Sequence, residues 1–309
     1  MSILVVGGSG FIGSHLVRKL VEIGEGVVIF DLLPNTEPIK DIVDKLKIVR
    51  GDATNIIDIL HAIKENDVSD IYHLVALLAD VSQINPMLAL KVNVESTLNI
   101  LEASRMLNLG KVIFASSVAV YDINNPVPVD EDAALKPTSV YGATKVLSEF
   151  YGIHYNNFFG VDFRALRFTT IYGLGKFGGS TGICSMLIEK TAIGQAVEVD
   201  AAEAVTDWLY IKDAVNSLLL ARKVENPKYR IYNIGGSSHS VREVVDIVEK
   251  FIPEAKIETK AKRLFPWPPS YSWLKAKEEL GYQPLFDIEK GVRDFIEEAR
   301  TKYIKHDLK

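Results

Sequence analysis

The amino-acid sequence predicts an α/β fold, with a doubly wound parallel sheet and a smaller α/β lobe. The first half of the chain alternates short apolar, β-branched runs with amphipathic helical patterns. Strands that are apolar along nearly their whole length are typical of parallel sheets whose two faces are both covered by helices. We expect strands at 2–6, 26–30, 46–50, 71–74, 111–115 and 161–168, and helices at 11–23, 56–64, 86–107 and from Ser139 onward.

The second half of the chain has a looser pattern. After about residue 170, a glycine-rich loop over 175–181 separates the last of these strands from further helical patterns. No shift in composition marks a linker, so the smaller lobe is expected to be interleaved with the first. Helices are expected at 183–193, 209–223 (preceded by a short strand), 238–251, 272–280 and 287–303.

A glycine-rich turn, Gly7-Gly8-Ser9-Gly10-Phe11-Ile12-Gly13, joins the first expected strand to the first expected helix. In this context glycines permit a tight turn and a close approach of the backbone to a pyrophosphate, which binds the free N–H groups at the helix N-terminus. A plain strand–helix turn needs one glycine rather than three. The pattern therefore predicts a Rossmann-type sheet with a dinucleotide site at Gly7, Gly10 and Gly13.

Asp31, at the end of the second expected strand, indicates which dinucleotide is bound. A carboxylate at this place accepts hydrogen bonds from the ribose hydroxyls and repels a 2′-phosphate, and no Lys or Arg follows before Lys40. We therefore expect NAD rather than NADP. Asp52 and Ala53 follow the third strand, where a side chain can reach the adenine; an equally open interpretation is that Asp52 or Thr54 caps the next helix.

Three side chains are candidates for acid–base chemistry. Tyr141 and Lys145 stand at positions i and i+4 near the start of a helix, and therefore on one face of it. A nearby ammonium and the positive helix N-terminus both favour the phenolate, so they should lower the pKa of the tyrosine. Ser116 and Ser117 end the fifth strand, where active sites of open α/β sheets gather.

Taken together, these motifs resemble those of the extended short-chain dehydrogenases/reductases, in the NAD-dependent epimerase/dehydratase family. The resemblance covers nearly the whole chain. The matching segments, in order, are Gly7–Gly13, Asp31, Gly51-Asp52-Ala53, His73-Leu74-Val75-Ala76, Asn93, Ser116-Ser117 with Val120-Tyr121, Tyr141-Gly142-Ala143-Thr144-Lys145, Leu166-Arg167-Phe168, Asp207–Asp213, Tyr232-Asn233-Ile234-Gly235, and Leu274–Lys277 before Leu280-Gly281-Tyr282.

The resemblance implies a role for each matching residue. Tyr141 would be the acid/base, Lys145 its pKa partner and a ribose ligand, and Ser117 the group that orients the reacting hydroxyl. It also implies that residues 1–170, with 210–235, form the NAD-binding domain, and that 171–309 form mainly the substrate-binding lobe. The implied cofactor-binding residues are Gly7, Gly10, Phe11, Ile12, Gly13, Asp31, Asp52, Ala53, Leu74, Ala76, Asn93, Tyr141, Lys145 and Phe168.

The substrate half departs from the pattern of nucleotide-sugar epimerases. Thr170 stands where an Asn usually binds the diphosphate, Thr206 where an Arg grips the other phosphate, and Trp273 where an Asp is usual. Arg263 remains at the place of a pyrophosphate-binding Arg, and charge-assisted partners are what a diphosphate needs. We expect Ser82, Gln83, Ser180, Thr181 and Arg263 to line the substrate pocket.

The sequence therefore supports two functions and argues against a third. The first is an epimerase or dehydratase that moves hydride between NAD and a secondary alcohol of a sugar or nucleotide sugar, as UDP-glucose 4-epimerases do. The alternative is an L-threonine 3-dehydrogenase-like activity on an amino alcohol, because His73–Ala79, Gly178–Thr181 and Trp267-Pro268 are similar to that short-chain type. A non-catalytic NAD-sensing regulator would typically lack the Tyr-Lys pair.

Composition limits the partners. A net charge of −5 gives no electrostatic footprint for nucleic acid, no segment is long and apolar enough for a membrane span, and the six histidines have no metal-ligand spacing. The single Cys184 excludes an internal disulfide and fits a cytoplasmic enzyme. We also expect a homodimer through the helices at 86–107 and 139–156, with Leu90, Val94, Leu98 and Leu101 among the apolar residues, although about half of these could instead face the sheet.

Overall fold

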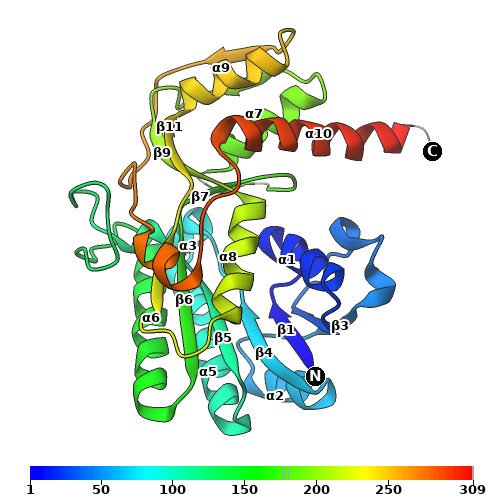
Figure 1. Cartoon of the computed structure of the whole chain (residues 1–309), viewed down its shortest axis with the longest axis vertical. Coiled ribbons are helices and arrows are strands. Elements are labelled where there is room, and N and C mark those ends of the chain that lie inside the picture. Colours follow the sequence, from blue (N-terminus) through cyan, green and yellow to red (C-terminus); the bar gives the residue numbers. More distant parts are fainter. Residues whose placement is uncertain (177, 180, 308–309) are drawn as a thin grey trace.

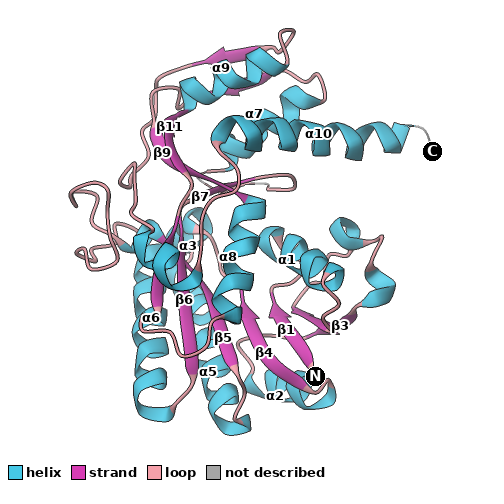
Figure 2. Cartoon of the chain, viewed as in Figure 1, coloured by secondary structure: helices cyan, strands magenta, loops and turns pink. Residues whose placement is uncertain are grey.

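The computed structural model describes residues 1–176, 178–179 and 181–307, and its centre is a parallel sheet of seven strands (Figures 1 and 2). The strand order is β10-β6-β5-β4-β1-β2-β3, and every neighbouring pair runs parallel. The strands are β1 (Ser2–Val6), β2 (Val27–Asp31), β3 (Lys47–Arg50), β4 (Val68–His73), β5 (Lys111–Ser117), β6 (Asp162–Phe168) and β10 (Ile231–Ile234).

Helices cover both faces of this sheet. Successive residues of a strand point to opposite faces, and in the central strands the residues on both faces are apolar. Along β1, Ile3 and Val5 pack in one core, with α1 (Phe11–Glu22) and α8 (Ile211–Lys223). Leu4 and Val6 pack in the other core. This second core contains residues of α2 (Ile56–Glu65), α5 (Ser96–Leu107) and α6 (Val140–Phe159). Burial on two faces is what a continuous apolar strand requires, so the fold class predicted from the sequence is confirmed.

The carboxyl ends of the strands meet at one edge of the sheet, where the strand order changes direction beside β1. The chain passes from β1 outward to β2 and β3, and then returns to the other side of β1 at β4. Ligands of doubly wound sheets bind in the crevice at this switch point. The loops after β1, β4, β5 and β6 therefore define where a functional site is to be sought.

A smaller lobe lies over this edge, above the arrowheads of the central sheet in Figure 1. It contains a three-stranded sheet, β11-β9-β7, and a parallel pair, β12-β8. Its strands are β7 (Thr170–Tyr172), β8 (Val197–Val199), β9 (Val205–Tyr210), β11 (Ser237–Ser240) and β12 (Ile257–Thr259), and its helices are α7 (Gly182–Ala192), α9 (Val241–Phe251) and α10 (Ile288–Asp307).

Several elements differ from the sequence prediction. The helix expected at 86–107 is divided into α4 (Pro86–Ala89), a π-helical segment η3 (Leu90–Glu95) and α5, and α3 (Ala79–Ile84) precedes it unpredicted. The helix expected from Leu209 begins at Ile211, because Leu209 and Tyr210 belong to β9; a short buried apolar run is compatible with either structure. Further short turns are η1 (Glu37–Ile39), η2 (Val43–Lys45), η4 (Val118–Val120) and the π-helical η5 (Ala276–Leu280).

Candidate active site

The glycine turn after β1 forms a cradle with no room for side chains. A Cβ atom on Gly13 would lie 2.2 Å from the Gly7 carbonyl oxygen, and Gly7 has a φ of +82°, which favours glycine. Gly10 is the N-cap of α1 and provides no side-chain cap, so the first N–H groups of the helix stay open to a ligand. This cradle fits the pyrophosphate of a dinucleotide.

Asp31 lies beside this cradle, at the end of β2. Its carboxylate accepts hydrogen bonds from the Ser9 backbone N–H at 3.2 Å and from the Ser9 hydroxyl at 2.6 Å. Asp31 is only partly buried, so lone pairs of the carboxylate remain for ribose hydroxyls. The structure thus brings Asp31 and the glycine turn into one site.

Asp52 makes local contacts instead of capping a helix. Its Oδ1 accepts from the Thr54 N–H and from the Thr54 hydroxyl, both at 2.8 Å. The N-cap of α2 is Asn55, whose side chain accepts from the Ile57 N–H, so the suggestion that Asp52 or Thr54 caps this helix is wrong. Ala53, which follows Asp52, is buried under the same turn.

Ser117, Tyr141 and Lys145 come together where β5 ends and α6 begins. The Tyr141 hydroxyl lies close enough to the Ser117 side chain for Ser117 to lower its pKa. The Lys145 ammonium donates to the Ala115 carbonyl oxygen at 2.6 Å and lies 5.6 Å from the centroid of the Tyr141 ring. Ser139 begins the helix by accepting from the Gly142 N–H, which fixes Tyr141 in its first turn.

Burial opposes charge on both Tyr141 and Lys145. Burial raises the pKa of Tyr141 to about 12, against the Ser117 side chain, which lowers it. Burial also lowers the pKa of Lys145 to about 7, against the Glu149 carboxylate, which raises it. The expectation that the tyrosine's pKa would be lowered is therefore wrong for this structure, because desolvation exceeds the effect of the neighbouring groups.

A buried ion pair lies directly behind these groups. Glu149, one turn beyond Lys145, pairs with Arg167 of β6 at 2.7 Å, and the two side chains are 3% and 2% exposed. The Ser116 hydroxyl donates to the same carboxylate at 2.5 Å, and the Arg167 guanidinium donates to the Tyr121 hydroxyl at 2.7 Å. This network joins α6 to β5 and β6. Ser116 therefore supports the helix, while Ser117 contacts Tyr141.

Asn93 has a supporting position. Its side chain is buried in η3, accepts from the Leu77 N–H at 2.7 Å and donates to the Leu77 carbonyl and to the Thr144 hydroxyl. It thereby ties the loop after β4 to the catalytic helix. Leu74 and Ala76 of this loop face the cavity, but Asn93 is not among the residues that line it.

A cavity of about 840 Å³ connects the cradle to the Ser117, Tyr141 and Lys145 cluster and continues toward the smaller lobe. This volume lies in the range of small-molecule sites. The lining includes Gly7, Gly10, Phe11, Ile12, Gly13, Leu74, Ala76, Asp80, Gln83, Ser117, Tyr121, Thr138, Ser139, Tyr141, Lys145, Phe168, Thr169, Thr170, Lys176, Thr181, Pro266 and Trp267.

Of the expected substrate residues, two line this cavity. They are Gln83 and Thr181. Ser82 is fully buried and its hydroxyl donates to the Leu77 carbonyl at 2.8 Å, while Arg263 pairs with Asp200 at 3.3 Å; neither is among the lining residues. Ser180 lies outside the described residues.

The structure adds one residue that the sequence did not single out and one contact that it did not predict. Lys176 lines the cavity from the glycine-rich loop. The Thr170 and Thr206 hydroxyls are hydrogen-bonded to each other at 2.7 Å, and the Trp267 indole N–H donates to Thr206 at 3.0 Å. Lys176 had a possible signal, since it is the one cation in a glycine-rich stretch. The pairing of two threonines 36 residues apart has no such signal.

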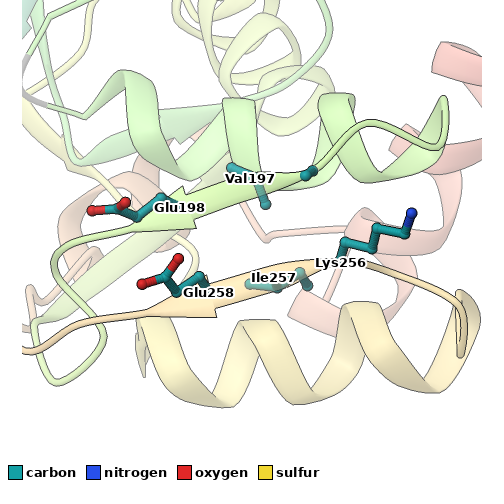
Figure 3. Close-up of a pocket in the computed structure, with 6 residues that line it drawn as sticks. Val197, Glu198, Lys256, Ile257 and Glu258 are labelled. Carbon is teal, nitrogen blue, oxygen red and sulfur yellow. The ribbon is translucent and has the colours of Figure 1, made fainter.

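A second hollow, of about 420 Å³, lies between β8 and β12 (Figure 3). Its sides are formed by Ala196, Val197, Glu198, Lys256, Ile257 and Glu258. Glu198 and Glu258 lie near each other and both pair with Lys260 at 2.9 Å. These charges are satisfied on the surface of the lobe, and we assign no function to this hollow.

The described residues form neither a metal site nor a membrane-spanning helix. No group of three or more His, Cys, Asp or Glu side chains there is arranged to hold a metal ion. No helix in that part of the chain is long and apolar enough to cross a membrane. The cytoplasmic location expected from the sequence stays a prediction.

The fold and the cavity are those of an extended short-chain dehydrogenase/reductase. Residues 3–235 match the model of the NAD dependent epimerase/dehydratase family, and the chain belongs to this family. It is accordingly an NAD-dependent enzyme, and the resemblance, cofactor and enzyme class predicted from the sequence are confirmed.

Similar proteins include epimerases and dehydrogenases. A Methanocaldococcus jannaschii protein provisionally named UDP-glucose 4-epimerase is 33% identical over 95% of this chain and 97% of its own length. The structure of a Thermotoga maritima UDP-glucose 4-epimerase with UDP-glucose has a TM-score of 0.89 at 28% identity, over 98% of this chain and all of that one. An L-threonine dehydrogenase of Clostridium difficile has a TM-score of 0.90 at 26% identity, over 97% and 98% of the two chains.

The buried ion pair gives a first prediction. Replacing Glu149 with Gln leaves the Arg167 guanidinium buried without its counter-charge, which should lower the free energy of unfolding by about 3–5 kcal/mol. The matched control is Glu102→Gln, which breaks an exposed Glu–Arg pair with Arg105 and should cost under about 1 kcal/mol. Urea denaturation at pH 7 measures both. Equal, small losses would show that the buried pair does not hold α6 to the sheet.

A second prediction concerns Asp31. Replacing it with Asn keeps an acceptor for Ser9 but removes the negative charge that we expect to bind the ribose. NAD binding should weaken by about tenfold or more, since hydrogen bonds to charged groups contribute about 1.5–3 kcal/mol, and the preference for NADH over NADPH should shrink. Fluorescence titration with both dinucleotides measures this ratio. Tighter binding of NADPH by the unmodified enzyme would contradict the role of Asp31.

Proposed function

We propose that this enzyme moves hydride between NAD and a secondary alcohol of a sugar or nucleotide sugar, with Tyr141 as the acid/base. The observation that carries the proposal is that Ser117, Tyr141 and Lys145 line the same cavity as the glycine cradle. When bound, NAD supplies the hydride acceptor. Ser117 and Tyr141 then both lie where a substrate hydroxyl can reach them.

The proton has a defined path in this arrangement. As the carbinol hydride leaves, the phenolate oxygen of Tyr141 takes the hydroxyl proton, and the Ser117 hydroxyl holds the substrate oxygen. Burial disfavours a lone phenolate and a lone ammonium, but the Tyr141 phenolate and the Lys145 ammonium offset each other as a pair. Epimerisation returns hydride to the other face of the carbonyl carbon, and the Tyr141 hydroxyl returns the proton.

We also propose that the lobe formed mainly by residues 171–309 binds the substrate. It contributes Lys176, Thr181 and Trp267 to the cavity beyond Tyr141. Nucleotide sugars are the first substrate class, because relatives over nearly the whole chain are named as UDP-sugar epimerases.

A second substrate class has its own support. Thr170 and Thr206 occupy positions where nucleotide-sugar epimerases hold a diphosphate, yet their hydroxyls bond to each other and to Trp267. Among the described residues that line the cavity there is no arginine. A cavity without arginine suits a small amino alcohol such as L-threonine better than a diphosphate.

The function is tested by supplying NAD with UDP-glucose, UDP-glucuronate or L-threonine. An epimerase should convert the UDP-sugar to its 4-epimer, measured by chromatography, without net NADH, because hydride returns to the product. A threonine dehydrogenase should instead accumulate NADH absorbance. In either case Tyr141→Phe should lose roughly 10²–10⁴-fold in turnover while NADH binding is retained. Near-normal turnover of Tyr141→Phe would remove the tyrosine from the mechanism.

We also propose a homodimer through the helices over 79–107 and 140–159. Of the residues first considered for this contact, Leu90 is 46% exposed, whereas Val94 and Leu101 are buried against their own subunit. Other exposed apolar residues on these helices are Val81, Ile84, Met87, Leu88, Met106, Leu147, Phe150, Phe158 and Phe159. Exposed apolar residues on neighbouring helices are typical of interfaces.

Light scattering at micromolar concentration should give the mass of two chains. Phe150 is 66% exposed and Phe158 is 72% exposed, so a double change of both to Glu should yield a folded monomer. The control is Leu264→Glu, an exposed apolar residue of the other lobe. A monomeric unmodified protein would exclude the dimer.

A further inference from the structure

The loop between β7 and α7 brings one lysine into the cavity. Gly175, with a φ of +88°, turns the chain there, and the His15 ring of α1 bonds to the Leu174 carbonyl oxygen at 3.0 Å. Lys176 lies two residues after Leu174. Its ammonium is 6.0 Å from the centroid of the Phe11 ring in the first turn of α1. The lysine is thus held beside the glycine cradle.

The ammonium of Lys176 has only neutral partners. It donates to the Ile171 carbonyl oxygen at 2.5 Å and to the Thr181 hydroxyl at 2.6 Å. An ammonium has three N–H donors, and no carboxylate of the described chain forms an ion pair with this one. Lys212, in contrast, pairs with both Asp294 and Glu298. The charge of Lys176 is therefore not compensated by the protein.

Among the described residues that line the cavity, Lys145 is the one other cation. The charged side chains of this lining are Asp80, Lys145 and Lys176, and Lys145 is already bonded to Ala115 beside Tyr141. Burial lowers the pKa of Lys176 to about 8. A desolvated, unpaired ammonium is unfavourable until an anion approaches it.

We propose that Lys176 is an anion-binding residue, which engages a phosphate or carboxylate group of the molecule held in this cavity. Its position between the glycine cradle and the Thr170, Thr181 and Trp267 end leaves two sources for the anion. One is the pyrophosphate of NAD, and the other is an anionic group of the substrate. This inference goes beyond the proposed function, because it holds for epimerisation and for net oxidation alike.

The titration of Lys176 gives the binding a pH dependence. An anion prefers the protonated form, so its affinity is full below pH 8 and falls as pH rises through the pKa of about 8. Each further pH unit should lower the affinity by about tenfold, until the higher pKa of the complex is reached. A neutral residue at position 176 removes this dependence.

The test compares the unmodified enzyme with Lys176→Gln and Lys176→Arg. Glutamine can still donate to Ile171 but has no charge, whereas arginine keeps the charge. The ligands are NADH and inorganic pyrophosphate with the enzyme alone, and UDP and L-threonine with NAD saturating, each titrated calorimetrically at pH 7.5 and pH 9. Uridine and L-threoninol, which lack the anionic groups, are the matched control ligands.

Lys176→Gln should weaken the binding of at least one anion by about tenfold or more and leave the affinities for uridine and L-threoninol unchanged. It should also abolish the loss of anion affinity between pH 7.5 and pH 9. Lys176→Arg should stay within a few-fold of the unmodified enzyme. A loss confined to NADH assigns the cofactor's pyrophosphate, and a loss confined to UDP or L-threonine assigns the substrate.

The proposal is overturned if, for every anion that the unmodified enzyme binds, the dissociation constant of Lys176→Gln differs by less than about twofold. Lys176 would then only fasten Ile171 to Thr181. Thermal melting of each variant without ligand shows whether the loop contact alone has been lost. All of these are binding measurements, so they are independent of whether Tyr141 performs the proposed chemistry.

Discussion

The buried ion pair between Glu149 and Arg167 is the interaction on which the active site depends. Two charges out of water are tolerated only in close, hydrogen-bonded geometry, and here the guanidinium makes contacts of 2.7 and 2.9 Å with the carboxylate. The pair therefore fixes how far α6 is rotated against β6. Tyr141, Lys145 and Glu149 are spaced by four residues and share one helix face, so fixing the last of them also places Lys145 on Ala115 and Tyr141 beside Ser117.

Small residues let this helix approach the sheet closely enough for the pair to form. A Cβ on Gly142 would lie 2.2 Å from the Ala119 carbonyl oxygen, and one on Gly152 would lie 2.2 Å from the Phe163 ring. Neither glycine has a positive φ, so each is required by contact and not by backbone conformation. The same dry packing that positions Tyr141 and Lys145 also removes water from them, which is why both pKa values move toward the neutral forms.

The fold and the cofactor end of the site could be predicted from the sequence because their signals are local. Gly7, Gly10 and Gly13 lie within one turn, and Tyr141 and Lys145 lie on one helix face. The substrate end could not be predicted, since it depends on residues far apart in the chain. Arg263 forms an ion pair with Asp200, while Ser82 is hydrogen-bonded to the backbone of Leu77 and Thr170 to Thr206. The predicted direction of the Tyr141 pKa shift was wrong for the same reason, because burial depends on how the whole structure packs.

This separation has a consequence for specificity. In the proposed function, hydride transfer needs only a secondary alcohol near Ser117 and Tyr141, and those groups are held by a regular strand and helix. The groups that we propose for the rest of the substrate come from the loops after β7 and around Trp267. There the Thr170 and Thr206 hydroxyls bond to each other and so require no ligand. If the anion that Lys176 binds belongs to the substrate, charge recognition at this end falls on its ammonium, which is held by neutral oxygens alone. A change in those loops can therefore alter which molecule is bound without disturbing α6, which explains how one fold accommodates both sugar epimerases and amino-alcohol dehydrogenases.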